Sequence, residues 1–434
     1  MDTLNFGDRY DFTLFDSKVI CRVTIENILC KRIVLMTEWI KCQIGDLCNT
    51  ISDTYKGKDS LVVLVNTSDV LEGKVLNHKT VFNENLKGQF KKTFKKNDIL
   101  YSEIRPANKR FAFIDFENTS NYIASTKLMV LRPNDKVLPR YLFALLKSNH
   151  LISELQHLAE TRSGTFPQIT FSSELSRIPV LLPNKETQKK VIDILSCIED
   201  KIDLNLAINN NLEQQAQAIF KAWFVDFEPF NGEMPSDWIT GTVDNLGTEI
   251  ICGKTPSTKK KEYYGGNIPF ITIPDMHDCV YNVSTERYLS AAGVASQPKK
   301  TLPPNTICVS CIGTAGLVTL VSEKSQSNQQ INSIVPKEGI SAYYIYLLMQ
   351  TLSETINKLG QSGSTIVNLN KTQFGKIQVA IPSEQVLYNF DTLCKPLFEM
   401  IHSNQKENLK LANLRDALLA KLMAGDLDIS DIDL

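Results

Sequence analysis

The feature that most constrains this chain is an internal repeat. The segment WIKCQIGDL (39–47) resembles WITGTVDNL (238–246) at an offset of 199 residues, and STKLMVLRP (125–133) resembles NQQINSIVP (328–336) at an offset of 203. Several matches that keep one order and nearly one offset are the signature of a duplicated unit. The 434 residues therefore predict two diverged copies of about two hundred residues each, too long for one ordinary core.

Each copy begins with a globular stretch of short apolar runs separated by Gly, Pro and Asn turns. Runs rich in Val, Ile, Phe and Thr, such as SLVVLVNT (60–67), predict strands. One segment in each copy, 138–158 and 341–359, has apolar residues at three- and four-residue steps and predicts a helix. The fold class expected is thus a mixed α/β (α+β) domain in two tandem copies, each closed by a proline, Pro183 or Pro382.

A long amphipathic segment follows each proline. Its seam residues, at alternating steps of four and three, are Val191, Leu195, Ile198, Ile202, Asn205, Asn209, Leu212, Ala216, Ile219 and Trp223 in the first copy, and Phe390, Leu393, Leu397, Met400, Asn404, Glu407, Leu411, Leu414 and Leu418 in the second. This spacing is typical of a coiled coil, and two amphipathic helices packed on their own domains are the alternative. Asn205 is equivalent to Asn404, and Leu212 to Leu411. A polar residue in such a seam costs stability but can fix register.

These patterns divide the chain into seven segments. They are an N-terminal extension of unknown role (1–38), a first globular domain (39–183), a first long helix (184–225), a linker (226–237), a second globular domain (238–382), a second long helix (383–425) and a C-terminal tail (426–434).

Bulk composition excludes several classes of protein. The formal net charge is −1, so any attraction to nucleic acid must come from local charge. The ten cysteines are scattered as free thiols of a reducing compartment would be, and Cys308-x-x-Cys311 lacks the second pair or histidines of a zinc site. The chain shows neither a signal peptide nor an apolar run approaching the ~20 residues of a membrane span, so we expect a cytoplasmic protein.

Enzymatic motifs are missing from the sequence. There is no phosphate-binding loop of the G-x-x-x-x-G-K-[ST] type, no G-x-G-x-x-G that opens a helix, and no Asn-Pro-Pro-Tyr-like tetrapeptide. The five histidines are isolated. These absences weigh against catalysis and favour a binding protein.

The positive signal is a set of basic loops with polar and aromatic neighbours. Lys and Arg neutralise phosphates, whereas Arg, Asn, Ser and Thr can read base edges. The candidate DNA-binding residues are Lys56, Lys58, Arg105, Asn108, Lys109, Arg110, Arg162, Lys254, Thr255, Ser257, Lys259, Lys260, Thr314 and Ser364. A further basic run, FKKTFKK (90–96), is better explained as solvated surface.

Local motifs resemble a known family. The segments GKTPSTKKKEYYGGNIPFI (253–271), CVSCIGTAG (308–316) and QQINSIV (329–335) resemble the target-recognition domain of type I restriction-modification specificity subunits. AIFKAWFVDFEPF (218–230) and LRDALLAKLMAGDL (414–427) resemble the ends of that family's two spacer helices. The likeness covers nearly the whole chain after the N-terminal extension, although the first copy lacks the G-K-T-P-S loop and the C-V-S-C-I-G run.

The resemblance implies a complete functional scheme. Each recognition domain would read one half of a bipartite double-stranded DNA target through the major groove, and the helices would pair as an antiparallel coiled coil that sets the gap. Two modification (methyltransferase) subunits would dock on this chain, and restriction (motor) subunits would join them. S-adenosylmethionine, ATP and Mg would belong to those partners, so no cofactor or metal is expected in this chain.

Two other classes remain open from the sequence alone. One is a diverged DNA methyltransferase or nuclease, which cofactor binding by the isolated chain would reveal. The other is a coiled-coil scaffold that reads no sequence. Loss of DNA binding with retained partner assembly, after mutation of Arg105 and Lys254, separates a reader from a scaffold.

Overall fold

The chain folds into two compact units. The computed structural model describes residues 39–84, 88–162, 166–361 and 367–424. Within them, the first unit contains the residues up to Asp200 and from Asn413 onward, and the second contains Lys201–Ala412. Two long helices, α4 (Lys185–Phe224) and α9 (Glu384–Ala424), each contribute to both units. The predicted extension (1–38) and tail (426–434) lie outside the described residues.

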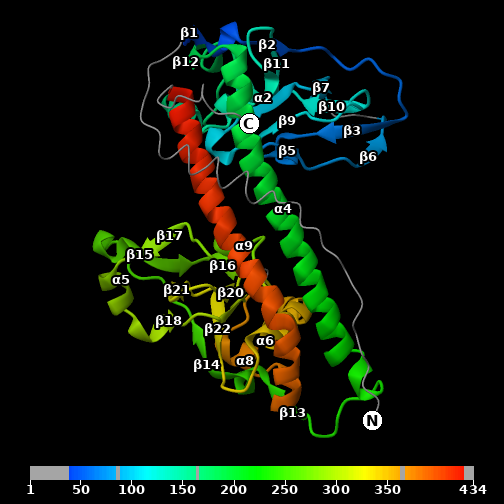
Figure 1. The fold of residues 1–434 in the computed structure, drawn as a ribbon, viewed down its shortest axis with the longest axis vertical. Helices are drawn as coiled ribbons and strands as arrows, with labels where there is room; N and C mark the ends of the chain where they lie inside the picture. The colour runs from blue at the N-terminus through cyan, green and yellow to red at the C-terminus, as the bar shows by residue number, and fades with distance from the viewer. Residues whose placement is uncertain (1–38, 85–87, 163–165, 362–366, 425–434) are drawn as a thin grey trace. The chain divides into compact units, whose positions relative to one another are not determined.

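The first unit holds two four-stranded sheets (Figure 1). In spatial order, one sheet consists of β2 (Cys48–Ile51), β11 (Leu128–Pro133), β8 (Ile99–Ser102) and β9 (Phe111–Phe113). The other consists of β6 (Thr80–Phe82), β3 (Leu61–Val65), β10 (Tyr122–Ser125) and β7 (Phe90–Lys92). Two small pairs complete the unit, namely β1 (Ile40–Gln43) with β12 (Pro179–Leu182) and β4 (Val70–Leu71) with β5 (Lys74–Val75).

The second unit also holds two sheets and a two-stranded pair. One sheet consists of β14 (Gly247–Cys252), β22 (Ile331–Pro336), β19 (Ile307–Ser310), β20 (Val318–Val321) and β16 (Tyr281–Asn282). The other consists of β17 (Arg287–Leu289), β15 (Tyr264–Ile271), β21 (Ser325–Ser327) and β18 (Thr301–Leu302). The pair consists of β13 (Ile239–Thr242) and β23 (Gln378–Ile381).

The two units repeat one topology. The order β2-β11-β8-β9 returns as β14-β22-β19-β20, and β6-β3-β10-β7 returns as β17-β15-β21-β18. The parallel pair of β3 with β10 corresponds to the parallel pair of β15 with β21. Val130 lies opposite Leu100 as Ser333 lies opposite Cys308, which keeps the offset of 203 between β11 and β22. The predicted fold class, two tandem mixed α/β domains, is confirmed.

The short helices differ from the sequence prediction in one respect. Each predicted single helix is two: α2 (Pro139–Leu146) and α3 (Asn149–Arg162) in the first unit, and α6 (Ala342–Thr351) and α7 (Ser353–Gly360) in the second. Ser148 interrupts the first pair because its hydroxyl accepts a hydrogen bond from the backbone N–H of Leu151, as an N-cap residue does. The second unit adds α5 (Ala291–Ala295) and α8 (Lys371–Gly375).

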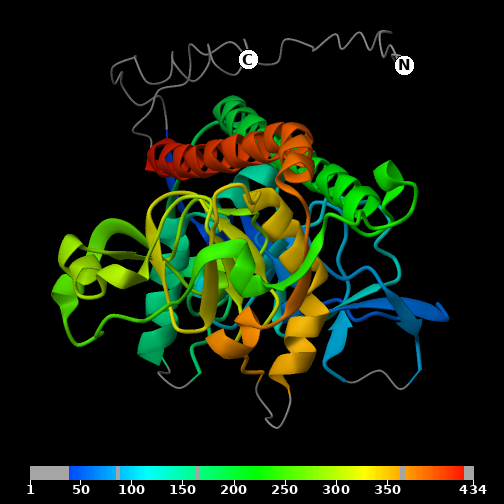
Figure 2. The same ribbon diagram turned by 90° about the horizontal axis from the view of Figure 1, so that it is seen from below.

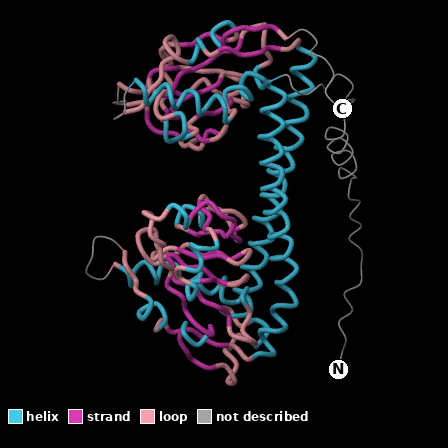
Figure 3. The backbone as a smooth tube through the Cα atoms, turned by 90° about the vertical axis from the view of Figure 1, so that its left-hand side faces the viewer, coloured by secondary structure: helices cyan, strands magenta, loops and turns pink. Residues whose placement is uncertain are grey.

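In the second unit, α4 and α9 lie side by side and run antiparallel (Figures 1 and 3). The Asn205 side-chain amide donates to the side-chain oxygen of Asn408 over 2.8 Å, and the Asn404 amide donates to that of Asn209 over 2.9 Å. From one hydrogen bond to the next, the residue number on α4 increases and that on α9 decreases, so the two helices are antiparallel. Asn205 is equivalent to Asn404, and Asn209 to Asn408. The two hydrogen bonds therefore exchange under a local twofold axis.

Two predicted seam positions on α9 are wrong. Leu393 and Met400 are 47% and 52% exposed. The buried residues of this stretch are instead Phe390, Cys394, Phe398 and Ile401. Their spacing follows an ordinary helix of 3.6 residues per turn because this stretch packs on the core of the second unit. The long helices thus pair with one another and also pack on a globular core, so the two interpretations of the sequence both apply.

The long helices α4 and α9 lie together on one side of the second unit, away from α6 and α8 (Figure 2). Phe220 of α4 and Phe390 of α9 share a core cluster with Leu320 and Ile334 of the larger sheet. Near the middle of α9, the His402 ring stacks on Tyr281 with centroids 4.2 Å apart. Aromatic burial of this kind stabilises the docking of the helices, at roughly 1.5–3 kcal/mol for each fully buried side chain.

The asparagine pairs lead to a stability prediction. Asn209→Ala removes the acceptor of the buried Asn404 amide, so we expect the free energy of unfolding of the full chain to fall by about 1–3 kcal/mol in urea titration. The double variant Asn209→Leu, Asn404→Leu removes both polar partners and should recover most of that loss. Gln214→Ala, at an exposed position of α4, is the matched control. A single variant as stable as this control contradicts the role of the pair.

Candidate nucleic-acid interface

The candidate residues of the first unit lie on three connections. Lys56 and Lys58 are exposed on the loop between β2 and β3. The loop between β8 and β9 carries Arg105, Asn108, Lys109 and Arg110. Arg162 ends α3, directly before the third connection.

The candidate residues of the second unit lie on the equivalent connections. The loop between β14 and β15 carries Lys254, Thr255, Ser257, Lys259 and Lys260. Thr314 is exposed on the loop between β19 and β20. Ser364, in the segment after α7, lies outside the described residues. Residues chosen separately in the two copies thus fall on the same structural positions.

Main-chain hydrogen bonds hold two of these connections together in both units. The backbone N–H of Arg105 donates to the carbonyl oxygen of Pro167, and that of Gly313 donates to Val367, each over 3.0 Å. Both donors have a left-handed backbone, with φ of 45° at Arg105 and 78° at Gly313. Glycine adopts this conformation freely, whereas a long side chain is strained there. Lys109, four residues later, has a similar φ of 51°.

The turn around Arg105 divides its cations into two groups. Lys109 forms an ion pair with Glu72 over 3.2 Å. The Arg110 guanidinium donates to the carbonyl oxygens of Ser68 and Val70 over 3.1 and 3.4 Å. These two residues fix the turn. Arg105 and Asn108 are exposed, and Arg105 forms no ion pair among the described residues.

Arg162 is engaged within the protein. Its guanidinium donates to both carboxylate oxygens of Glu174, over 3.0 and 3.2 Å. Glu174 also accepts hydrogen bonds from the backbone and hydroxyl of Thr170. The charge of Arg162 is therefore neutralised, and its geometry indicates that it anchors the third connection.

The basic loop of the second unit is held at its base and open at its tip. The backbone N–H of Lys254 donates to Ser327, and the Thr255 hydroxyl donates to the Gln329 side chain over 2.8 Å. Gly253 permits this close approach, because a Cβ there would lie 2.1 Å from the carbonyl oxygen of Asn328. Ser257 and Lys259 remain exposed at the tip.

Lys260 is oriented by an aromatic neighbour. Its ammonium donates to the Tyr263 hydroxyl over 3.0 Å and lies 5.0 Å from the centre of the Tyr263 ring. These contacts raise the pKa of Lys260, chiefly through the hydrogen bond to Tyr263. The side chain keeps its charge and is held in one direction, as a phosphate contact requires.

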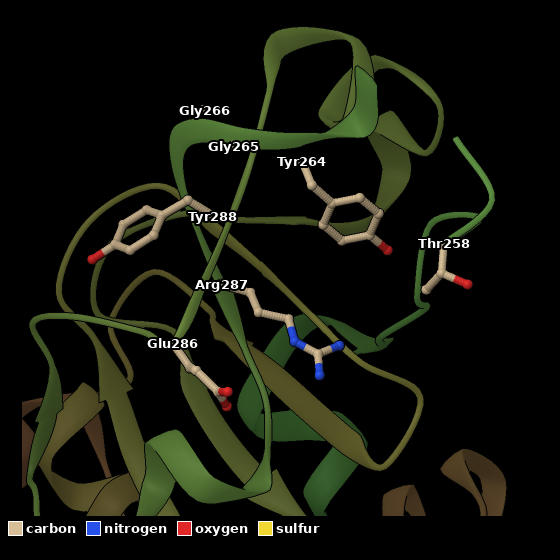
Figure 4. A pocket seen from close by; sticks show the side chains of 7 residues that line it. All are labelled: Thr258, Tyr264, Gly265, Gly266, Glu286, Arg287 and Tyr288. Carbon is tan, nitrogen blue, oxygen red and sulfur yellow. The ribbon is translucent and has the colours of Figure 1, made fainter. Parts of the chain in front are cut away.

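The sequence did not predict the hollow that lies next to this loop. Thr258, Tyr264 and Arg287 line an open hollow of about 480 Å3 (Figure 4). Arg287 is an isolated cation in a short edge strand, so no cluster of charge marked it in the sequence. Only the strand pairing brings it to the basic loop.

The part of the chain that the structure describes offers neither a metal site nor a reactive pair of cysteines at Cys308 and Cys311. No group of three His, Cys, Asp or Glu side chains there is placed to hold a metal ion. Burial raises the pKa of both Cys308 and Cys311 to about 12, so these thiols stay protonated at neutral pH, whereas zinc binding needs thiolates. None of the described helices is long and apolar enough to cross a membrane.

Known proteins share both the sequence and the fold of this chain. The family model of the type I restriction modification DNA specificity domain matches residues 36–214 and 235–395, once in each copy. The chain is 39% identical to the type I restriction enzyme HindI specificity subunit of Haemophilus influenzae, over 90% of this chain and 100% of that protein. It is 27% identical to the MjaIX specificity subunit of Methanocaldococcus jannaschii, over 69% and 72% of the respective chains.

A solved structure shares the fold. The crystal structure of the type I restriction-modification system S subunit from M. genitalium matches with a TM-score of 0.54 and 16% sequence identity. The match covers 91% of this chain and 98% of that one.

The two arginines of the first unit give a paired prediction. We expect Arg105→Ala to weaken binding of duplex DNA by roughly tenfold, because an exposed guanidinium is removed. Arg162→Ala should weaken binding by less than about twofold, because Glu174 already neutralises that charge. Fluorescence anisotropy of labelled duplex at one fixed salt concentration measures both. Equal losses for the two variants would contradict this division of roles.

Proposed function

Because the chain belongs to the DNA specificity subunits of type I restriction-modification enzymes, we propose that its two units read the two halves of a bipartite double-stranded DNA target. One observation carries this proposal: a single topology occurs twice, with different side chains on equivalent loops. At one left-handed position the first unit presents Arg105 and the second presents Gly313. Two different readers on one chain suit two different half-sites, read in the major groove where every base pair is distinguishable.

The proposed domain boundaries follow the sequence repeat. The first target-recognition domain is 39–183 and the second is 238–382, with spacer helices at 184–225 and 383–425 and a linker at 226–237. Strand pairing supports these boundaries, because β12 ends at Leu182 and β23 ends at Ile381, each one residue before the closing proline. In the spacers, Asn205, Asn404, Leu212 and Leu411 would fix the register of the antiparallel helices.

The spacer helices are also the proposed docking surface for partners. We expect two modification (methyltransferase) subunits to bind them and the adjoining surfaces, with restriction (motor) subunits joining the assembly. Exposed apolar side chains support a protein partner there, namely Leu204, Leu206 and Ile208 on α4 and Met400 on α9. S-adenosylmethionine, ATP and Mg would be bound by those partners, in the cytoplasm where the target DNA lies. Family membership disfavours a pure scaffold and a diverged methyltransferase or nuclease.

Selection from random duplex DNA tests the reading of a split target. This chain, purified with its methyltransferase subunits, should recover a motif of two specified parts separated by a gap of fixed length. The two parts should differ in sequence, because the equivalent loops differ. Recovery of no motif from a folded and assembled complex would remove the recognition proposal.

A length change in both helices tests whether the spacers set the gap. Midway between the two asparagine pairs, Ala207 lies opposite Lys406, its own repeat equivalent. Inserting four residues after Ala207 and four before Lys406 keeps both pairs and lengthens each helix by about 6 Å. Four residues make one turn plus about 40°, so each domain returns to nearly the same face. At ~3.4 Å per base pair, the gap should grow by about two base pairs.

The same selection experiment measures the gap of the insertion variant. Both half-sites should be recovered unchanged. A four-residue insertion in the linker after Asn231, outside the helices, is the control and should leave the gap as it is. An unchanged gap in the doubly lengthened variant would exclude the helices as the ruler.

A further inference from the structure

Strand β15 leaves its pairing with β17 for three residues. Tyr264 and Ile268 both lie opposite Leu289, so the residues between them form a bulge. Gly265 has a φ of 81°, and a Cβ on Gly266 would lie 2.4 Å from the carbonyl oxygen of Leu289. The bulge therefore needs glycine at both positions. Bulges of this kind open a sheet edge locally and redirect nearby side chains.

The bulge opens the hollow next to the basic loop (Figure 4). The Arg287 side chain extends into this hollow between Tyr264 and Glu286, and Thr258 lines the hollow with its hydroxyl turned away from Arg287. Tyr264 is fixed because its hydroxyl donates to the carbonyl oxygen of Pro256 over 2.7 Å. The volume of about 480 Å3 falls in the range of sites that bind small molecules or parts of larger ligands.

The charge of Arg287 is not used inside the protein. Among the described residues, no carboxylate forms an ion pair with its guanidinium, and the side chain is exposed. Burial raises the pKa of Tyr264, and the positive charge of Arg287 partly offsets this effect. An exposed guanidinium beside a hydroxyl and an aromatic ring is a ready site for an anion.

The first unit has a cation at the same place. Val65 of β3 and Ile271 of β15 hold equivalent positions beside the parallel strands β10 and β21. Two residues earlier on each strand, β3 pairs with Thr80 and β15 pairs with Tyr288. Thr80 of β6 therefore corresponds to Tyr288 of β17.

The residue that precedes each of these is Lys79 in the first unit and Arg287 in the second. Both are exposed. Their neighbours differ, since His78 stands where the second unit has Glu286. The two units thus share only a positive charge at this position, not a side chain.

We infer that Arg287 binds a phosphate of the DNA backbone in this hollow. The inference rests on the proposed function and adds a contact to it. If the two units read different bases, the phosphodiester backbone is the only part of the DNA that both of them meet. A positive charge that both units carry at one position is therefore suited to a backbone phosphate. Thr258, which lines the same hollow, can donate a second hydrogen bond once its side chain rotates toward Arg287.

Binding measurements on the complex with the methyltransferase subunits test this inference. We expect Arg287→Ala to lower affinity by the same factor, about tenfold at low salt, for the selected target and for unrelated duplex. Loss of one phosphate contact reduces the slope of log affinity against log salt by about 0.9, so the deficit should shrink roughly three- to fourfold between about 50 and about 200 mM salt. Glu286→Gln should act in the opposite direction, with tighter binding, because it removes a negative charge near the phosphate.

Two variants make the test specific. Arg287→Lys keeps the charge and should retain the wild-type salt slope. Lys324→Ala removes another exposed cation, directly before β21, and should leave binding unchanged. A loss confined to the selected target, with one motif position relaxed, would overturn the phosphate assignment in favour of base reading. An unchanged affinity and slope would overturn it outright, whereas a wild-type complex that selects no target would overturn the proposed function itself.

Discussion

The hydrogen bonds between the asparagines of α4 and α9 are the constraint on which the rest of the structure depends. A buried amide without a partner is costly, so the helices are held in the register that pairs Asn205 with Asn408 and Asn209 with Asn404. A slide by one helical turn in either direction would leave only one asparagine opposite another asparagine, so one of the two pairs would be lost. Because the two bonds exchange under the repeat offset of 199 residues, the register of the helices follows from the sequence repeat.

The two units share a backbone framework but differ in the side chains that they expose on it. The main-chain bonds that join Arg105 to Pro167 and Gly313 to Val367 are alike in both units, so the loops keep their course while their side chains change. Backbone hydrogen bonds do not depend on the side chain, which allows a reader to change its specificity without refolding. At Arg105 the backbone of the loop keeps a left-handed φ although the residue there has a long side chain, which is strained in that conformation.

The sequence predicted the large-scale organisation because repeats and periodicity survive divergence. It identified the duplicated units, the long helices and the polar seam, whereas the equivalence of the loops that carry the candidate residues became visible only in the strand topology. It missed what depends on contacts between distant segments. Leu393 and Met400 fit the seam pattern but are exposed, because α9 packs on the core of the second unit through a different set of residues. The sequence did not show that Glu174 forms an ion pair with Arg162. It also did not show that strand pairing brings Arg287 next to the basic loop.

The near-zero net charge explains how such a reader avoids binding DNA indiscriminately. Non-specific affinity comes almost entirely from neutralised phosphates, and it grows with the number of cations that face the duplex. Here the chain as a whole carries a formal charge of −1, and internal pairs such as Lys109 with Glu72 withdraw further cations from the surface. Among the exposed cations that remain, Arg105, Lys254 and Lys259 lie on the candidate loops. Attraction to the backbone is therefore local and limited, so contacts with base edges make up a larger share of the binding free energy at the correct site.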